Sequence, residues 1–167
     1  MRTKKISILM TLILGMIIGL AGCSQEKEKS TLQEIAPVHK DKISTFSVTR
    51  GNSGTTEFTD REHIKTIVDR LEKIKFSKMN LEQEKEVFQE GRVFSQDTTY
   101  FIQLLERGEY NQVLYEVQLA ILSETELILN DSATIQEKRT ISYINQKDEA
   151  SLEAVKELHS LVKTIME

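Results

Sequence analysis

Residues 44–74, STFSVTRGNSGTTEFTDREHIKTIVDRLEKI, contain two strand patterns, the turn between them and the helix pattern that follows. In the first run Phe46 and Val48 share one side, as alternate residues of a strand do. The segment Gly51 to Gly54 is rich in turn-forming residues, and a run typical of a strand, Thr55 to Phe58, comes after it. This part of the chain therefore predicts a β-hairpin.

A helix is predicted directly after the hairpin. Thr59 and Glu62 have the spacing of a capping box, in which the threonine side chain accepts from the backbone amide of Glu62 and the glutamate side chain reaches back. Five apolar residues then recur at helical offsets and share one face: Ile64, Ile67, Val68, Leu71 and Ile74. Such a stripe is typical of a helix that packs on a core.

The second half of the chain predicts four more strands and a closing helix. The strand segments are rich in β-branched and aromatic residues and are Thr99–Arg107, Asn111–Ile121, Glu126–Leu129 and Glu137–Ile144. Alternation in the second of them predicts a buried side with Val113, Tyr115, Val117 and Leu119 and a wetted side with Gln112, Glu116 and Gln118. The closing helix, from about Glu149 to Met166, has apolar residues at helical spacing. Residues 77–96 are highly charged and have no clear period, so they stay unassigned.

Together these elements predict an α+β fold in which one antiparallel sheet of about six strands has two main helices packed on one face. A chain of 167 residues favours a single domain. With 39% apolar and 29% charged residues, the composition is that of a folded soluble protein. The chain has 22 basic and 26 acidic residues, and this balance argues against binding of nucleic acid.

The first 22 residues have the layout of an export signal peptide. Arg2, Lys4 and Lys5 precede an apolar run that extends from Ile6 to Leu20. A permanent transmembrane anchor is the alternative, although the apolar stretch of about 17 residues is short for a bilayer, which needs about 20.

The tetrapeptide Leu20-Ala21-Gly22-Cys23 resembles the lipobox of bacterial lipoproteins, and it contains the only cysteine of the chain. The resemblance implies that the Cys23 thiol receives a diacylglyceryl group and that a signal peptidase cuts between Gly22 and Cys23. Two acyl chains hold a protein stably on a membrane, whereas one does so only marginally. The alternative is an unmodified thiol at Cys23. The predicted location is the extracytoplasmic face of the cell membrane, with the covalent lipid on Cys23 as the only attached group.

Residues 23–42 are predicted to be the lipidated cysteine and a polar tether, and residues 43–167 the folded domain. The segment 24–42 has mixed charges and the only proline, a composition that does not drive burial. The alternative is that Leu32, Ile35 and Val38 pack against the domain.

Cleavage before Cys23 would remove three basic residues and no acidic ones, which changes the formal charge from −4 to −7. An acidic body should not lie flat on an anionic bilayer. The same negative charge argues against binding of nucleic acid, which requires neutralisation of phosphate groups.

Motifs for catalysis or metal binding are not found in the sequence. The three histidines, His39, His63 and His159, have no ligand spacing, and the Gly51–Gly54 segment fits a hairpin turn better than a serine-nucleophile elbow. A cluster of carboxylates lacks the pattern of a calcium loop and is interpreted as a solvated face: Glu82, Glu84, Glu86 and Glu90. We therefore predict no catalytic residue, no metal and no cofactor other than the lipid.

The hairpin that runs into Thr59-Asp60, Ile64 and an amphipathic helix resembles the YhfM-like small lipoproteins of Gram-positive bacteria. This resemblance covers about 30 residues of generic capping and core chemistry. It implies a sheet fold like that of the TATA-binding protein and no known reaction.

Two functions remain as hypotheses. The first is a non-enzymatic interaction or ligand-binding module that engages an envelope protein or peptide through an edge strand or through the uncovered sheet face, for instance by Tyr100, Gln103, Gln112, Glu116 and Gln118. The second is an envelope enzyme or small-solute receptor with a pocket built from residues far apart in sequence. A flat wetted sheet would favour the first and a pocket with converging polar side chains the second.

Overall fold

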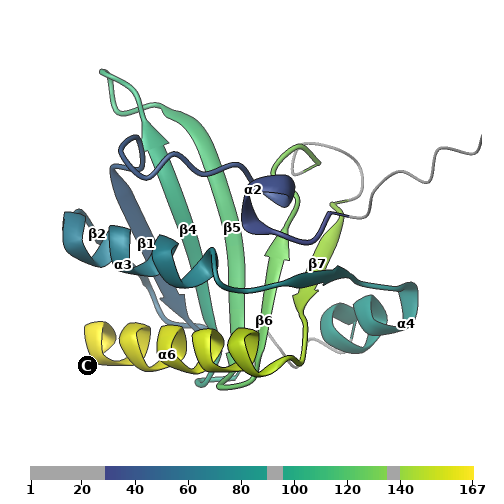
Figure 1. Cartoon of the computed structure of the whole chain (residues 1–167). Coiled ribbons are helices and arrows are strands. Elements are labelled where there is room, and N and C mark those ends of the chain that lie inside the picture. Colours follow the sequence, from purple (N-terminus) through teal and green to yellow (C-terminus); the bar gives the residue numbers. More distant parts are fainter. Residues whose placement is uncertain (1–28, 90–95, 135–139) are drawn as a thin grey trace, which may run out of the picture.

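A computed structural model describes residues 29–89, 96–134 and 140–167. Its strands are β1 (Thr45–Arg50), β2 (Thr55–Phe58), β3 (Phe76–Lys78), β4 (Tyr100–Arg107), β5 (Val113–Ser123), β6 (Glu126–Asn130) and β7 (Ser142–Asn145). Its helices are α2 (Leu32–Ile35), α3 (Arg61–Leu71), α4 (Leu81–Glu84), the π-helical turn η1 (Lys85–Gln89) and α6 (Glu149–Met166). Figure 1 shows these elements in place.

The strands form one seven-stranded antiparallel sheet in the order β2-β1-β4-β5-β6-β7-β3. The predicted α+β class and the β1–β2 hairpin are confirmed, and the prediction of about six strands missed β3. This strand has only three residues, and its last two lie at the start of the charged segment 77–96 that the sequence left unassigned. Its pairing with β7, which is far away in sequence, defines it as a strand.

The main core lies between one face of the sheet and the helices α2, α3 and α6. Figure 1 shows α3 and α6 side by side across this face, with α2 nearer the end of the sheet where β6 ends. The predicted stripe of α3 is buried throughout, and so is Ile74 just beyond the helix end. From the sheet, alternate residues of the central strands point into this core: Phe46, Val48, Ile102, Leu104, Val117, Leu119, Ile121, Leu127 and Leu129.

The start of α3 differs by one residue from the predicted capping box. Asp60, not Thr59, is the N-cap, and its Oδ1 accepts from the backbone N–H of His63 at 2.8 Å. An aspartate at this place both satisfies a free amide and favours the positive end of the helix dipole. Asp148 has the same role at α6, where its side chain accepts from the backbone N–H of Ser151.

The prediction of a polar tether that reaches residue 42 is wrong, and the alternative that this segment packs against the domain is confirmed. Leu32, Ile35, Ala36 and Val38 are all buried and belong to the main core. Thr31 and Glu34 close a capping box that starts α2. Apolar residues spaced by three along a capped turn gain enough from burial to order an otherwise polar segment.

Leu32→Ala tests this assignment. We expect a loss of about 2–5 kcal/mol in the free energy of unfolding, because the leucine is fully buried and its removal leaves a cavity. Chemical denaturation of the purified protein measures the change. The matched control is Leu81→Ala, at a leucine that is 56% exposed, where about 0.5 kcal/mol or less is expected. Equal effects of the two variants would contradict the placement of α2 in the core.

The outer half of the β4–β5 hairpin lacks the predicted buried side. Val117 and Leu119 are buried, but Tyr115 is only partly buried and Val113 is 49% exposed. β1 begins opposite Leu105 and β6 ends near Gln118, so the residues of the hairpin beyond these points pair only with each other. Figure 1 shows this hairpin extending beyond the rest of the described chain.

Candidate functional site

The face of the sheet opposite α3 and α6 contains three of the five residues predicted for an uncovered face. Gln103, Glu116 and Gln118 are half-buried there and bond to one another. Tyr100 is a wrong assignment, because it is 2% exposed in the main core and its ring meets that of His159 edge-on at 5.6 Å. Residues 100 and 103 of one strand differ by an odd number and therefore point to opposite faces. Gln112 is exposed in the turn of the β4–β5 hairpin.

A row of polar side chains crosses this second face over five adjacent strands, and we call it the amide row: Ser47, Gln103, Glu116, Gln118, Asn130 and Ser142. The strand register produces it, since Ser47 lies opposite Gln103, Gln103 opposite Gln118, and Asn130 opposite Ser142. Each member comes from a different strand except Glu116 and Gln118, which are two residues apart on β5 and so share its face.

Hydrogen bonds connect the amide row from end to end. Ser47 Oγ donates to Gln103 Oε1 at 3.0 Å, and Gln103 Nε2 donates to Glu116 Oε1 at 2.5 Å. Gln118 Nε2 donates to the same carboxylate oxygen at 2.9 Å.

The second half of the row continues through β6 to β7. Asn130 Nδ2 donates to Gln118 Oε1 at 3.4 Å, and Ser142 Oγ donates to Asn130 Oδ1 at 3.0 Å. Because neighbouring partners fix each carboxamide, the row is preorganised as a line of donors and acceptors.

A cavity of about 380 Å³ lies over this face, next to the amide row. Gln103, Gln118 and Asn130 form its polar wall. Apart from Thr49, the other residues that line it are apolar: Phe88, Phe101, Ile102, Leu119, Ala120 and Ile128. Ala120 and Ile128 are buried without belonging to the main core cluster, so this face has an apolar environment of its own. A mostly apolar cavity of this size with a few ordered polar groups is typical of a small-ligand site.

Among residues 29–89, 96–134 and 140–167, no side chain that lines this cavity is ionisable. The nearest carboxylate of the amide row, Glu116, accepts from two carboxamides rather than facing the cavity. General acid–base or nucleophilic chemistry needs a titratable or activated group beside the substrate. The arrangement therefore fits binding better than catalysis.

Sequence reasoning missed Phe88, Asn130 and Ser142. Phe88 comes from η1, inside the segment without a clear period, and Asn130 lies one residue beyond the predicted end of its strand. The paired apolar residues Val87 and Phe88 in a charged stretch were the available signal. Nothing in the local sequence indicates that Phe88 lines a cavity together with residues of β1, β4, β5 and β6.

A wider hollow of about 1100 Å³ lies along the outer side of α6. Its walls carry charges of both signs, including Arg70, Lys147 and Glu157. Arg70 Nε lies 3.2 Å from Glu157 Oε2, without the alignment that a hydrogen bond requires, and Lys147 pairs with Glu126 at 3.2 Å. This hollow is larger but open to solvent, and exposed charge pairs contribute little specificity. We therefore favour the smaller cavity.

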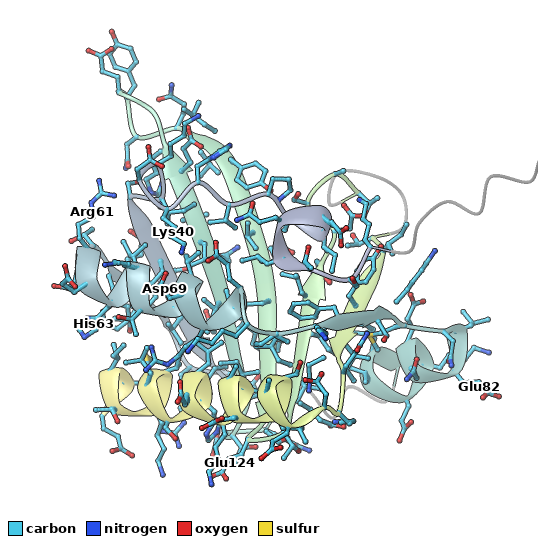
Figure 2. The ribbon with its side chains drawn as sticks, viewed as in Figure 1. Lys40, Arg61, His63, Asp69, Glu82 and Glu124 are labelled. Atoms are coloured by element: carbon cyan, nitrogen blue, oxygen red, sulfur yellow. The ribbon has the colours of Figure 1, made fainter. Side chains whose placement is uncertain are left out.

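The three histidines lie in three different places. His39 is exposed before β1, His63 is in the first turn of α3 with Nδ1 3.3 Å from Asp60 Oδ1, and His159 packs on Tyr100. Within residues 29–89, 96–134 and 140–167, no three His, Cys, Asp or Glu side chains are grouped as metal ligands. Figure 2 shows Glu82, on α4, and Glu124 at separate edges of the molecule. Glu90 of the predicted carboxylate cluster, like Gly22 and Cys23, lies outside the described residues.

In the part of the chain that the structure describes, four groups have displaced pKa values, and none of them lines the cavity. The ammonium of Lys40 and the carboxylate of Asp69 bond at 2.6 Å, which raises the pKa of Lys40 and lowers that of Asp69; Figure 2 shows the two side chains together. Hydrogen bonds from Ser151 lower the pKa of Asp148. Burial raises the pKa of Tyr115. Each shift follows from a structural contact.

No helix among the described parts of the chain is both long and apolar enough to cross a bilayer. Comparison with family models, with curated proteins and with solved structures finds nothing that matches this chain.

Proposed function

We propose that the protein is a lipid-anchored binding module on the extracytoplasmic face of the cell membrane, and that its ligand occupies the cavity beside the amide row. The single observation behind the ligand site is the preorganised line of carboxamides next to an apolar hollow. The Leu20–Cys23 motif supports the anchor.

The chemistry of the walls defines the ligand class. Carboxamides both donate and accept hydrogen bonds, while Phe88, Phe101 and Ile128 favour an apolar or aromatic body. The described residues of the wall offer no charge to a charged ligand, which would lose its hydration there without an opposite charge. The ligand is therefore an uncharged molecule with amide-like groups on one edge, such as a small solute or a side chain and main-chain amide of a peptide.

The alternative of an envelope enzyme is less well supported, since the described part of the cavity wall has no ionisable side chain. The alternative of a small-solute receptor gains support, because this face is hollowed rather than flat. A small-solute receptor and a peptide-binding module would both bind their ligand at this cavity wall. The size of the ligand that binds most tightly distinguishes the two.

Ala120→Phe tests the cavity. In the unaltered protein, we expect N-acetyl-phenylalaninamide to cause saturable NMR shifts in the side-chain amides of Gln103, Gln118 and Asn130. In the Ala120→Phe variant, the added ring fills the cavity, so we expect this binding to weaken by at least about tenfold. The carboxylate analogue N-acetyl-phenylalanine should bind more weakly to the unaltered protein.

The matched control is Ala150→Phe, at an exposed alanine near the start of α6. Melting curves establish that both variants fold, and Ala120→Leu replaces Ala120→Phe if the larger ring disrupts the sheet. NMR shifts that appear only in residues of α6 would contradict the assignment of the ligand site. Equal binding of the probe by the Ala120→Phe and Ala150→Phe variants would contradict it as well.

Cys23→Ala tests the anchor. We expect the diacylglyceryl mass and the cleavage after Gly22 to be lost, while the domain still melts cooperatively, because the position precedes the folded part. Mass spectrometry and membrane fractionation measure both effects, with Ser24→Ala as the control. If the precursor is uncleaved and unlipidated even with Cys23 present, an uncleaved transmembrane anchor replaces this proposal.

A further inference from the structure

The turn of the β4–β5 hairpin, residues 108–114, exposes three large apolar side chains, and we call it the hairpin tip. Tyr110 is 86% exposed, Leu114 57% and Val113 49%. In the described chain only Leu81, on α4, is a further large apolar residue of this exposure. The hairpin tip has no flanking strand on either side, as β1 and β6 pair with β4 and β5 only farther inward.

Backbone bonds hold the hairpin tip in one conformation. Gly108 N–H donates to Gln112 O at 2.9 Å, and Asn111 N–H donates to Gly108 O at 3.0 Å. Asn111 has φ = 62°, a left-handed conformation that asparagine tolerates in turns. Arg107 Nη1 donates to Asn111 O at 3.2 Å. The apolar side chains are thus presented on an ordered turn.

The described chain begins at the same end of the sheet. Lys29 Nζ lies 2.7 Å from Oδ2 of Asp131, a buried carboxylate directly after β6. The hydroxyl of Tyr115, on the outer part of β5, donates to Ser132 Oγ at 2.8 Å. Since β5 and β6 are antiparallel, the beginning of β5 and the end of β6 share one end of the sheet. The hairpin tip and Lys29 therefore leave the body on the same side.

The length of chain before Lys29 limits how far this end lies from the anchor. Six residue steps separate Cys23 from Lys29, an extended span of about 20 Å. Leu119 pairs with Leu129, so Asp131 lies level with Val117, and Val113 is four residues farther out, about 14 Å at the rise of a strand. Val113 therefore lies about 14 Å past Asp131, a distance shorter than the extended tether of about 20 Å.

We propose that the hairpin tip inserts Tyr110, Val113 and Leu114 into the interface of the bilayer that holds the Cys23 lipid, as a second membrane contact. The inference rests on the lipid anchor of the proposed function. Tyrosine favours the boundary between headgroups and acyl chains. The aliphatic pair Val113 and Leu114, as neighbours on one strand, adds apolar surface on the two sides of the hairpin. The contact is apolar, so it does not need anionic lipids, which the acidic body would disfavour. It would fix the orientation of the sheet relative to the membrane.

The test uses the full lipidated chain with Tyr110→Cys, whose thiol is the only one open to labelling once Cys23 is acylated. A nitrobenzoxadiazole dye is attached, and the protein is placed in phosphatidylcholine vesicles that contain spin-labelled lipids. We expect a blue shift and strong quenching by the lipid spin labels. The matched control is Asn52→Cys, an exposed turn at the opposite end of the sheet, where no quenching is expected.

A second variant tests the two aliphatic side chains while the labelled position stays the same. Val113→Ser with Leu114→Ser, in the Tyr110→Cys background, should reduce the quenching at least about twofold without changing the melting curve, because both side chains are exposed. Intact quenching in this variant would overturn the role of the aliphatic pair.

Flotation with the vesicles and the lipid mass on Cys23 separate the two proposals. If the protein floats and carries the lipid but the dye at position 110 stays in water, the hairpin tip does not contact the bilayer and the lipid anchor stands. If Cys23 carries no lipid, the anchor fails and the second contact is overturned with it.

Discussion

Val68→Asp is expected to unfold the domain. Val68 is fully buried in α3 and belongs to the stripe that faces the sheet. A carboxylate there would lose its hydration without a partner, a cost of about 4 kcal/mol or more. Because small domains are stable by only about 5–15 kcal/mol, we expect loss of a cooperative melting transition near room temperature, measured by circular dichroism.

The matched control is Lys65→Asp, which introduces the same carboxylate on the exposed side of the same helix. Its effect should stay within about 0.5–1 kcal/mol, since the group remains hydrated. A normal melting curve for Val68→Asp would contradict the assignment of α3 as a core helix.

Asn145→Leu should have the second-largest effect. The Asn145 side chain is 2% exposed and ties the end of β7 to the start of β6. Its Oδ1 accepts from the N–H of Leu127 at 2.8 Å, and its Nδ2 donates to the carbonyls of Thr125 and Gln146, each at 3.1 Å. Leucine has a similar volume but leaves the N–H of Leu127 and the carbonyl of Gln146 without this partner, whereas the carbonyl of Thr125 keeps the bond from Lys147 Nζ at 3.1 Å. At about 1–3 kcal/mol for each group left unpaired, we expect a loss of about 2–6 kcal/mol.

Denaturant titration measures this loss, with Asn52→Leu as the control in an exposed turn. Hydrogen exchange adds a local readout, because the amide of Leu127 should lose protection before the amides of β4 do. If Asn145→Leu is as stable as the unaltered protein, the bridge between β6 and β7 contributes nothing and this argument is wrong.

The candidate site was predictable only in part. Alternation along single strands correctly placed Glu116 and Gln118 on one side of β5, and Gln103 joins them in the structure. Tyr100 was misplaced because the expected face combined residues of both parities on one strand. The residues that complete the amide row, Ser47, Asn130 and Ser142, depend on the register between strands.

By itself the sequence determined the α+β class, the β1–β2 hairpin and the buried face of α3, because these depend on periodicity within a few turns or strand residues. Only the tertiary structure decided that α2 joins the core, that β3 pairs with β7 and that Phe88 lines a cavity over the far face. Each of these depends on contacts between segments far apart in the chain. The free energy that favours them comes from surfaces that exist only after the sheet has formed, so short-range patterns carry no record of it.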